Sequence, residues 1–194
     1  RGQRHRELRE AAERLVDEIK FRVSYEVRPE LLRDDGNLEA IEQLIWRAER
    51  QLVLVCPSPR WSGIRRFTSA LEEALTRGVQ IVLIWGRSSD DEFDHGVARV
   101  LTDLAQRVGG NHARLLRSGR SSKIHVNLAV ADDREAVLTG LNFMVAGGRD
   151  QEDARGPVGR ERGIRLTAPR ADAPCRVIED LLAWCARVVP EYTL

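Results

Sequence analysis

Residues 123–142, "KIHVNLAVADDREAVLTGLN", are the most informative stretch of this sequence, because two short apolar segments flank an Asp-Asp pair typical of a turn. Successive side chains of a strand alternate between its two faces. The first segment therefore predicts one apolar face, made of Ile124, Val126, Leu128 and Val130. Its other face carries Lys123, His125 and Asn127. Such a polar row costs free energy unless it lines a site or meets water, so a functional site and a solvated edge strand are the two alternatives.

Apolar strands and amphipathic helices alternate along the rest of the chain. Continuous apolar runs at 51–55 and 79–86 predict buried strands. Apolar side chains at helical spacing predict helices over 38–48, 63–77 and 96–108, and a closing helix over 175–189. Two further short strands are expected at 113–117 and 163–167. The pattern predicts an α/β fold with a mixed, mostly parallel sheet sandwiched between helices.

The length of 194 residues favours one domain with a sizeable core. We expect residues 1–37 to form an N-terminal helix and a connecting segment, and residues 38–194 to form the domain. The hydrophobic fraction is 42%, but no apolar run is long enough to cross a bilayer. The charged fraction is 31% and the net charge is only +1, so global charge names no partner.

The cysteines and the chain start predict the setting. Cys56, Cys175 and Cys185 form neither an even disulfide framework nor a metal-ligand spacing, which favours a reduced, cytoplasmic location. No targeting segment is visible at the start, "RGQRHREL". The start also lacks a Met, so we expect this domain to be part of a larger, multidomain protein.

The spacing of polar residues in the opening stretch resembles a known motif. His125-x-Asn127 is followed after four residues by Asp132, and after six more by Thr139-Gly140-x-Asn142. This is similar to the HKD motif of the phospholipase D superfamily, His-x-Lys, four residues, Asp, six residues, Gly-Ser-x-Asn. The resemblance covers about residues 38–188 and implies one half of a phospholipase D-like fold. Asn127 replaces the motif lysine, and Thr139-Gly140 replaces Gly-Ser.

The resemblance implies a role for each matched position. His125 would attack phosphorus and form a phosphohistidine, and Asn142 would hold a phosphate oxygen. Asp132 would be a turn residue or an orienting residue. Glu161 matches an acidic residue that follows the motif in many members, so it either orients a catalytic histidine or is a solvated carboxylate.

Other positions would complete the phosphate site. Asn127 can still donate a hydrogen bond but brings no charge, and Lys123 on the same predicted face could supply that charge. Thr139 and Gly140 stand where the motif contacts phosphate. Arg120, which precedes the motif, either attracts phosphate or belongs to a solvated loop face.

The resemblance also implies a reaction and partners. The expected activity is phosphodiester hydrolysis, with nucleic acid as the partner and with no metal or other cofactor. Phospholipid is disfavoured as a substrate because no basic amphipathic helix or aromatic cluster would reach a membrane. The chemistry needs two histidines and the chain has one motif, so either a homodimer or a second phospholipase D-like half would supply the other. The alternative is a degenerate module that binds nucleic acid or a protein partner and dimerises.

Overall fold

The structure is a computed structural model that describes residues 27–86, 91–121, 124–144, 161–169 and 175–188, without the side chains of residues 61 and 91–95. The expected N-terminal helix lies outside these residues, which begin at Val27. Among the described helices, none is both long and apolar enough to cross a membrane.

Strands and helices follow one another as the apolar pattern predicts. In chain order the described elements are β1 (Arg28–Arg33), α2 (Gly36–Arg47), β2 (Gln51–Cys56), α3 (Trp61–Thr76), β3 (Gln80–Trp85), α4 (Asp91–Val108), the 3₁₀ helix η1 (His112–Leu115), β4 (Leu116–Arg120), β5 (Asn127–Ala131), β6 (Glu135–Thr139), β7 (Arg162–Thr167) and α5 (Arg176–Val188). The expected strand at 113–117 is replaced by η1 and the start of β4. Gly78 ends the turn after α3 with a φ of 91°, the left-handed conformation that glycine adopts without a steric penalty.

The seven described strands form one sheet in the order β1-β7-β6-β5-β2-β3-β4. This confirms an α/β fold with a mixed sheet. The expectation of a mostly parallel sheet is corrected, because only β2–β3 and β3–β4 pair in parallel and the other four pairs are antiparallel. The physical reason is that β5, β6 and β7 are consecutive strands that pair as neighbours with no described helix between them, whereas parallel neighbours need helical crossovers.

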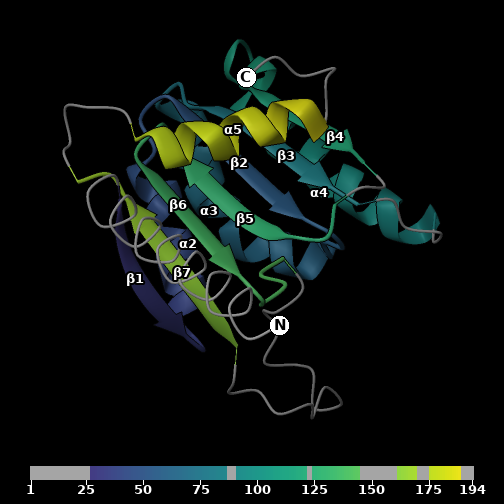
Figure 1. Ribbon diagram of the computed structural model, residues 1–194. Helices are drawn as coiled ribbons and strands as arrows, with labels where there is room; N and C mark the ends of the chain where they lie inside the picture. The colour runs from purple at the N-terminus through teal and green to yellow at the C-terminus, as the bar shows by residue number, and fades with distance from the viewer. Residues whose placement is uncertain (1–26, 87–90, 122–123, 145–160, 170–174, 189–194) are drawn as a thin grey trace, which may run out of the picture.

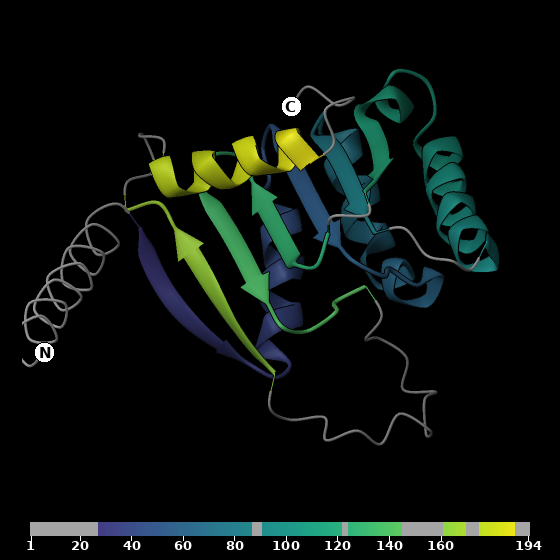
Figure 2. The same cartoon turned by 45° about the vertical axis from the view of Figure 1, so that its right-hand side comes forward.

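Helices cover both faces of the sheet, as expected (Figure 1 and Figure 2). On one face, α2, α3 and α4 pack over a core that includes Ile41, Phe67 and Leu104. On the other face, α5 lies across the strands and closes a second, smaller core around Val130 and Ile178. The two cores fix the sheet from both sides and leave the strand ends as the places where polar side chains can gather.

The opening polar stretch is only partly a strand. Ile124, Leu128 and Val130 are buried in the core under α5, so the predicted apolar face is confirmed. However, β5 begins at Asn127, and His125 therefore precedes the strand rather than lying on its face. The pairing of β5 with β2 ends at Leu128 opposite Val55. Beyond β2 the chain continues into Pro57, which has no N–H and cannot extend the ladder.

The strand β1 was missed by the sequence-based prediction, which assigned residues 28–33 to a connecting segment. It pairs with β7 at one edge of the sheet. Only Leu32 of its six residues is buried, so it lacks the alternating pattern of a half-buried strand. Charged residues and Pro29 are typical of an edge strand, where an unpaired N–H side faces solvent.

Candidate active site

All but one of the described candidate residues lie at the same end of the strands, where the order in which strands are added to the sheet changes direction. From β2 the chain adds β3 and β4 on one side, and later adds β5, β6 and β7 on the other side. Ligands of open α/β sheets bind beyond the carboxyl ends of strands at such a switch point. The carboxyl ends of β2 and β6 and the start of β5 meet at this edge. We call it the switch edge.

His125 and Asn127 lie at the switch edge in different surroundings. The side chain of His125 is exposed, in the segment directly before β5. Asn127 is only 9% exposed, and its Oδ1 has no hydrogen-bond partner among the described residues. A buried carbonyl without a partner costs about 1–3 kcal/mol. A native protein retains such a group where a function requires it, or where a water or a ligand supplies the missing hydrogen bond.

Asn142 is held at the same edge by contacts to two other residues. The Cys56 thiol donates to Asn142 Oδ1 at 2.7 Å, and Asn142 Nδ2 donates to the Ser58 carbonyl oxygen at 3.2 Å. Burial raises the pKa of Cys56 to about 12, against the smaller opposing effect of backbone hydrogen bonds from Ser58 and Met144. The thiol therefore keeps its proton at neutral pH and acts as a donor.

The loop that carries Asn142 packs tightly on the start of α3. The backbone N–H of Arg60 donates to the Met144 carbonyl oxygen at 2.8 Å. A Cβ at Gly63 would collide with the same carbonyl, so only glycine fits this position. The first turn of α3 thus fixes the position of the loop backbone at Met144. The two hydrogen bonds to Cys56 and Ser58 fix the orientation of the Asn142 side-chain amide.

Thr139, Gly140 and Glu161 join the end of β6 to the start of β7 at the switch edge. Thr139 lies opposite Asn127 in the β5–β6 ladder, and its Oγ1 accepts the Leu141 N–H at 2.9 Å. The Gly140 N–H donates to the Arg162 carbonyl oxygen at 3.1 Å. A Cβ on Gly140 would lie 2.8 Å from the carboxylate of Glu161, which is exposed. Phosphate contacts by Thr139 and Gly140, and an orienting role for Glu161, stay predictions.

Two cationic positions were predicted near the site. Arg120 is the last residue of β4 and is exposed at the switch edge, but its strand is three positions from β5 in the sheet. Lys123, the predicted substitute for the motif lysine, lies outside the described residues. Arg120 is thus the one of these two whose place in the sheet is described.

Asp132 lies at the opposite edge, at the far end of β5 from His125. Its carboxylate accepts the backbone N–H groups of Glu49, Arg50 and Gln51 at 3.1, 2.8 and 3.0 Å. Asp132 is the first residue of the turn between β5 and β6 and has a positive φ of 54°. Asp132 lies five residue steps along the strand from Asn127, about 17 Å. Asp132 is therefore a turn residue, and the alternative of a catalytic, histidine-orienting role is corrected by this distance.

Sequence reasoning missed Cys56 and Ser58 as parts of the site. Cys56 was considered only as a disulfide or metal-ligand candidate, and Ser58 was not considered. A signal was present, because "QLVLVCPSP" places a polar loop directly after a buried strand that runs toward the switch edge. The partner of both residues, Asn142, is 86 and 84 positions away, so no local pattern joins them.

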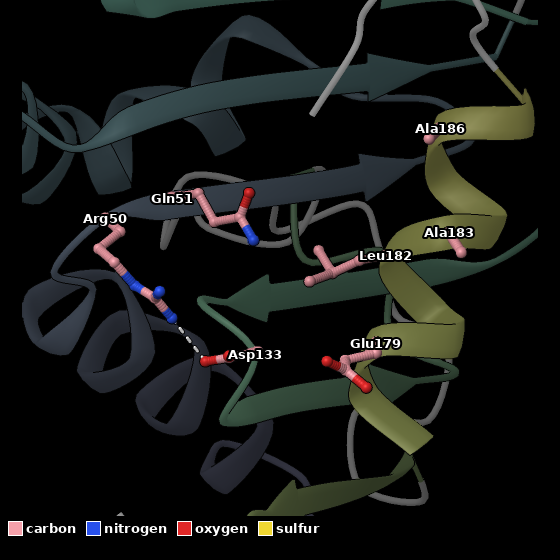
Figure 3. A pocket seen from close by; sticks show the side chains of 7 residues that line it. All are labelled: Arg50, Gln51, Asp133, Glu179, Leu182, Ala183 and Ala186. Atoms are coloured by element: carbon pink, nitrogen blue, oxygen red, sulfur yellow. Dashed lines mark hydrogen bonds and ion pairs between the residues drawn. The ribbon is translucent and has the colours of Figure 1, made fainter. Parts of the chain in front are cut away.

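A cavity of about 380 Å³ lies at the edge of the sheet opposite the switch edge (Figure 3). Its lining residues are Arg50, Gln51, Asp133, Glu179, Leu182, Ala183 and Ala186. Arg50 and Asp133 form an ion pair of 2.6 Å across its mouth, and helix α5 supplies the apolar wall. Within the described part of the chain, no group of three His, Cys, Asp or Glu side chains is placed to hold a metal ion.

Comparisons with known proteins identify the fold. No protein-family model matches the chain, and no curated protein sequence matches it. Among solved structures, it is similar to Nuc from Salmonella typhimurium, a member of the phospholipase D family, with a TM-score of 0.59 and 12% identity over 84% of this chain and 94% of that chain. NucT from Helicobacter pylori is similar with a TM-score of 0.53 and 12% identity over 84% of this chain and 96% of that one.

A third similar structure is TrmBL2, an archaeal chromatin protein whose structure is described as showing a novel mode of DNA binding. Its TM-score is 0.53 at 12% identity, over 95% of this chain and 62% of that chain. At identities this low, the structural similarity shows a shared fold alone. The seven-stranded mixed sheet between two helix layers is therefore a fold that this chain shares with Nuc, a phospholipase D family member, in agreement with the fold expected from the spacing of His125, Asp132 and Asn142.

Proposed function

We propose that this chain hydrolyses phosphodiester bonds in nucleic acid by a metal-independent route, with His125 as the nucleophile. The observation that carries the proposal is that an exposed imidazole and an Asn142 amide held by two hydrogen bonds both lie at the switch edge. A reactive nucleophile beside a fixed hydrogen-bond donor suits attack on phosphorus. Structural similarity to Nuc, a phospholipase D family member, supports the same chemistry.

The proposed reaction has two displacement steps. A neutral nitrogen of His125 forms a bond to phosphorus, and the bond from phosphorus to the leaving oxygen breaks as that oxygen takes a proton from a second histidine. Water then attacks phosphorus, the second histidine takes the proton of that water, and the phosphorus–nitrogen bond breaks. The products are a phosphate monoester and an alcohol, and both histidines return to their starting forms.

The proposed reaction uses two histidines, and the described part of the switch edge offers one exposed imidazole, so the second must come from elsewhere. We propose that it comes from His125 of a second copy, or from another phospholipase D-like half in a longer chain. The switch edge would then face its counterpart across a shared cleft. Asn142 and Asn127 would donate to the phosphate oxygens from each side.

Cleavage of an end-labelled oligonucleotide in EDTA, followed over a range of protein concentrations, tests the metal-independent dimer. We expect cleavage to survive chelation, and the rate per chain to fall on dilution as sedimentation shows the dimer separating. Activity lost in EDTA and restored by Mg²⁺ would contradict the metal-independent route. A strictly monomeric and fully active chain would contradict the dimer.

The second candidate function is a degenerate module that binds nucleic acid or a protein partner without cleavage. The observation that favours it is Asn127, an uncharged residue at the position of the motif lysine. The two functions give different reasons for the presence of the unpaired Asn127 carbonyl oxygen. A working site can retain an unfavourable buried group because activity requires it, whereas a module without activity gains nothing from retaining it.

We expect Asn127→Val to raise the free energy of unfolding by about 1 kcal/mol or more, because it removes the unpaired buried oxygen. In a working site it should also lower cleavage by about 10²-fold, because a donor to phosphate is lost. Thr139→Val is the matched control in the same cross-strand pair. It removes an oxygen that does have a partner, so it should lower stability. Chemical denaturation and the cleavage assay measure both variants, and an Asn127→Val chain with unchanged cleavage would contradict the donor role.

A further inference from the structure

Cys56 makes a directional contact that decides how the Asn142 amide is turned. It is the last residue of β2 and is 0% exposed, so its thiol has no access to water. A buried thiol that keeps its proton is a donor, and its sulfur lies 2.7 Å from Asn142 Oδ1. On the other side of the amide, the backbone carbonyl oxygen of Ser58 can only accept a hydrogen bond.

These two contacts exclude the flipped amide. Turning Asn142 by 180° about its last bond would place its carbonyl oxygen against the Ser58 carbonyl oxygen and its NH₂ group against the Cys56 S–H. The hydrogen bond to Ser58 would be lost, two carbonyl oxygens would face each other, and the S–H···O contact would be exchanged for a weaker N–H···S contact. In the observed orientation Nδ2 uses one N–H on Ser58 and retains a second N–H for another acceptor.

We propose that Cys56 is a positioning residue for phosphate binding, whose S–H holds the Asn142 amide so that its remaining N–H points to the phosphate oxygen. The inference rests on the proposed function, because that function makes Asn142 a phosphate ligand. It adds a residue that the motif does not contain, from a different strand and 86 positions earlier in the chain. A bound phosphate would touch Asn142 and not Cys56.

The test compares Cys56→Ser with Cys56→Ala, because the two side chains are nearly equal in volume and differ in one hydroxyl donor. The probe is inorganic phosphate, followed through the side-chain amide resonances of Asn142 in ¹⁵N-labelled protein. These resonances are assigned by their loss in Asn142→Ala. The oligonucleotide cleavage rate is measured on the same samples.

We expect Cys56→Ala to weaken phosphate binding about 10-fold and to shift the Asn142 resonances even without phosphate, because one hydrogen bond is lost. Cys56→Ser should keep both close to those of the parent. Cys185→Ala is the control, because Cys185 is a second buried thiol, carried by α5 in the core on the other face of the sheet. It should alter stability without altering phosphate binding.

Two results separate failure of this inference from failure of the proposed function. If the parent cleaves and Cys56→Ala binds phosphate as tightly as the parent, the positioning role is overturned. Equal losses of phosphate affinity in the alanine and serine variants would overturn it as well. A parent that neither binds phosphate nor cleaves, while the Asn142 resonances still shift in Cys56→Ala alone, contradicts the proposed function and leaves the Cys56 contact established.

Discussion

His125→Ala is expected to lower the rate of phosphodiester cleavage by at least about 10³-fold, because it removes the atom that bonds to phosphorus. The free energy of unfolding should change by less than about 0.5 kcal/mol, because the side chain is exposed and lies outside the strand. Single-turnover cleavage and chemical denaturation measure the two effects. A variant that loses stability together with activity would point to a structural histidine.

His112 supplies a matched control in the same chain. It begins η1, away from the switch edge strands β2, β5 and β6, and is partly buried. His112→Ala should leave cleavage unchanged.

Adding an excess of His125→Ala to the parent should suppress the activity of the parent through mixed dimers, if both copies supply a histidine. Unchanged activity after subunit exchange would contradict the shared site.

Asp132→Ala is expected to lower the free energy of unfolding by about 3 kcal/mol. Its carboxylate is the acceptor for three consecutive backbone N–H groups at the start of β2, and the residue is 4% exposed. Each donor left without a buried partner costs about 1–3 kcal/mol, less where water reaches it. The φ of 54° adds strain for alanine, whereas aspartate tolerates this conformation.

Asp133→Ala tests this account in the neighbouring position. Asp133 forms an ion pair with Arg50, whose side chain is 60% exposed, and such pairs contribute at most about 1 kcal/mol. Urea denaturation should therefore rank Asp132→Ala far below Asp133→Ala in stability. Folded Asp132→Ala protein should retain phosphate binding, because the turn lies about 17 Å along β5 from Asn127. Equal destabilisation of the two variants would contradict the turn role.

The sequence predicted the layers of the fold well, because burial imposes a pattern on neighbouring residues. Runs such as "IVLIW" in β3 are apolar throughout, since helices cover both faces of a central strand. Edge strands carry no such requirement, and β1 was missed for that reason. The pairing directions also escaped prediction, because apolar runs in a covered sheet look alike in parallel and antiparallel neighbours.

The candidate site was predicted in part. The intervals between His125, Asp132 and Asn142 indicated the family fold, since they fix the length of two strands and a turn. They did not separate the structural residue from the others, because spacing along the chain does not show that Asp132 lies at the opposite end of the strands from His125 and Asn142. The Cys56 contact needs the tertiary fold, which alone brings β2 beside the Asn142 loop.

Trapping of the covalent intermediate tests the central claim most directly. The parent is mixed with excess oligonucleotide in EDTA, quenched in alkaline denaturant, which spares phosphohistidine, digested and analysed by mass spectrometry. The account predicts a phosphoryl-linked nucleotide on the peptide that contains His125, absent in His125→Ala. Cleavage without any adduct, or an adduct on a different residue, would contradict it.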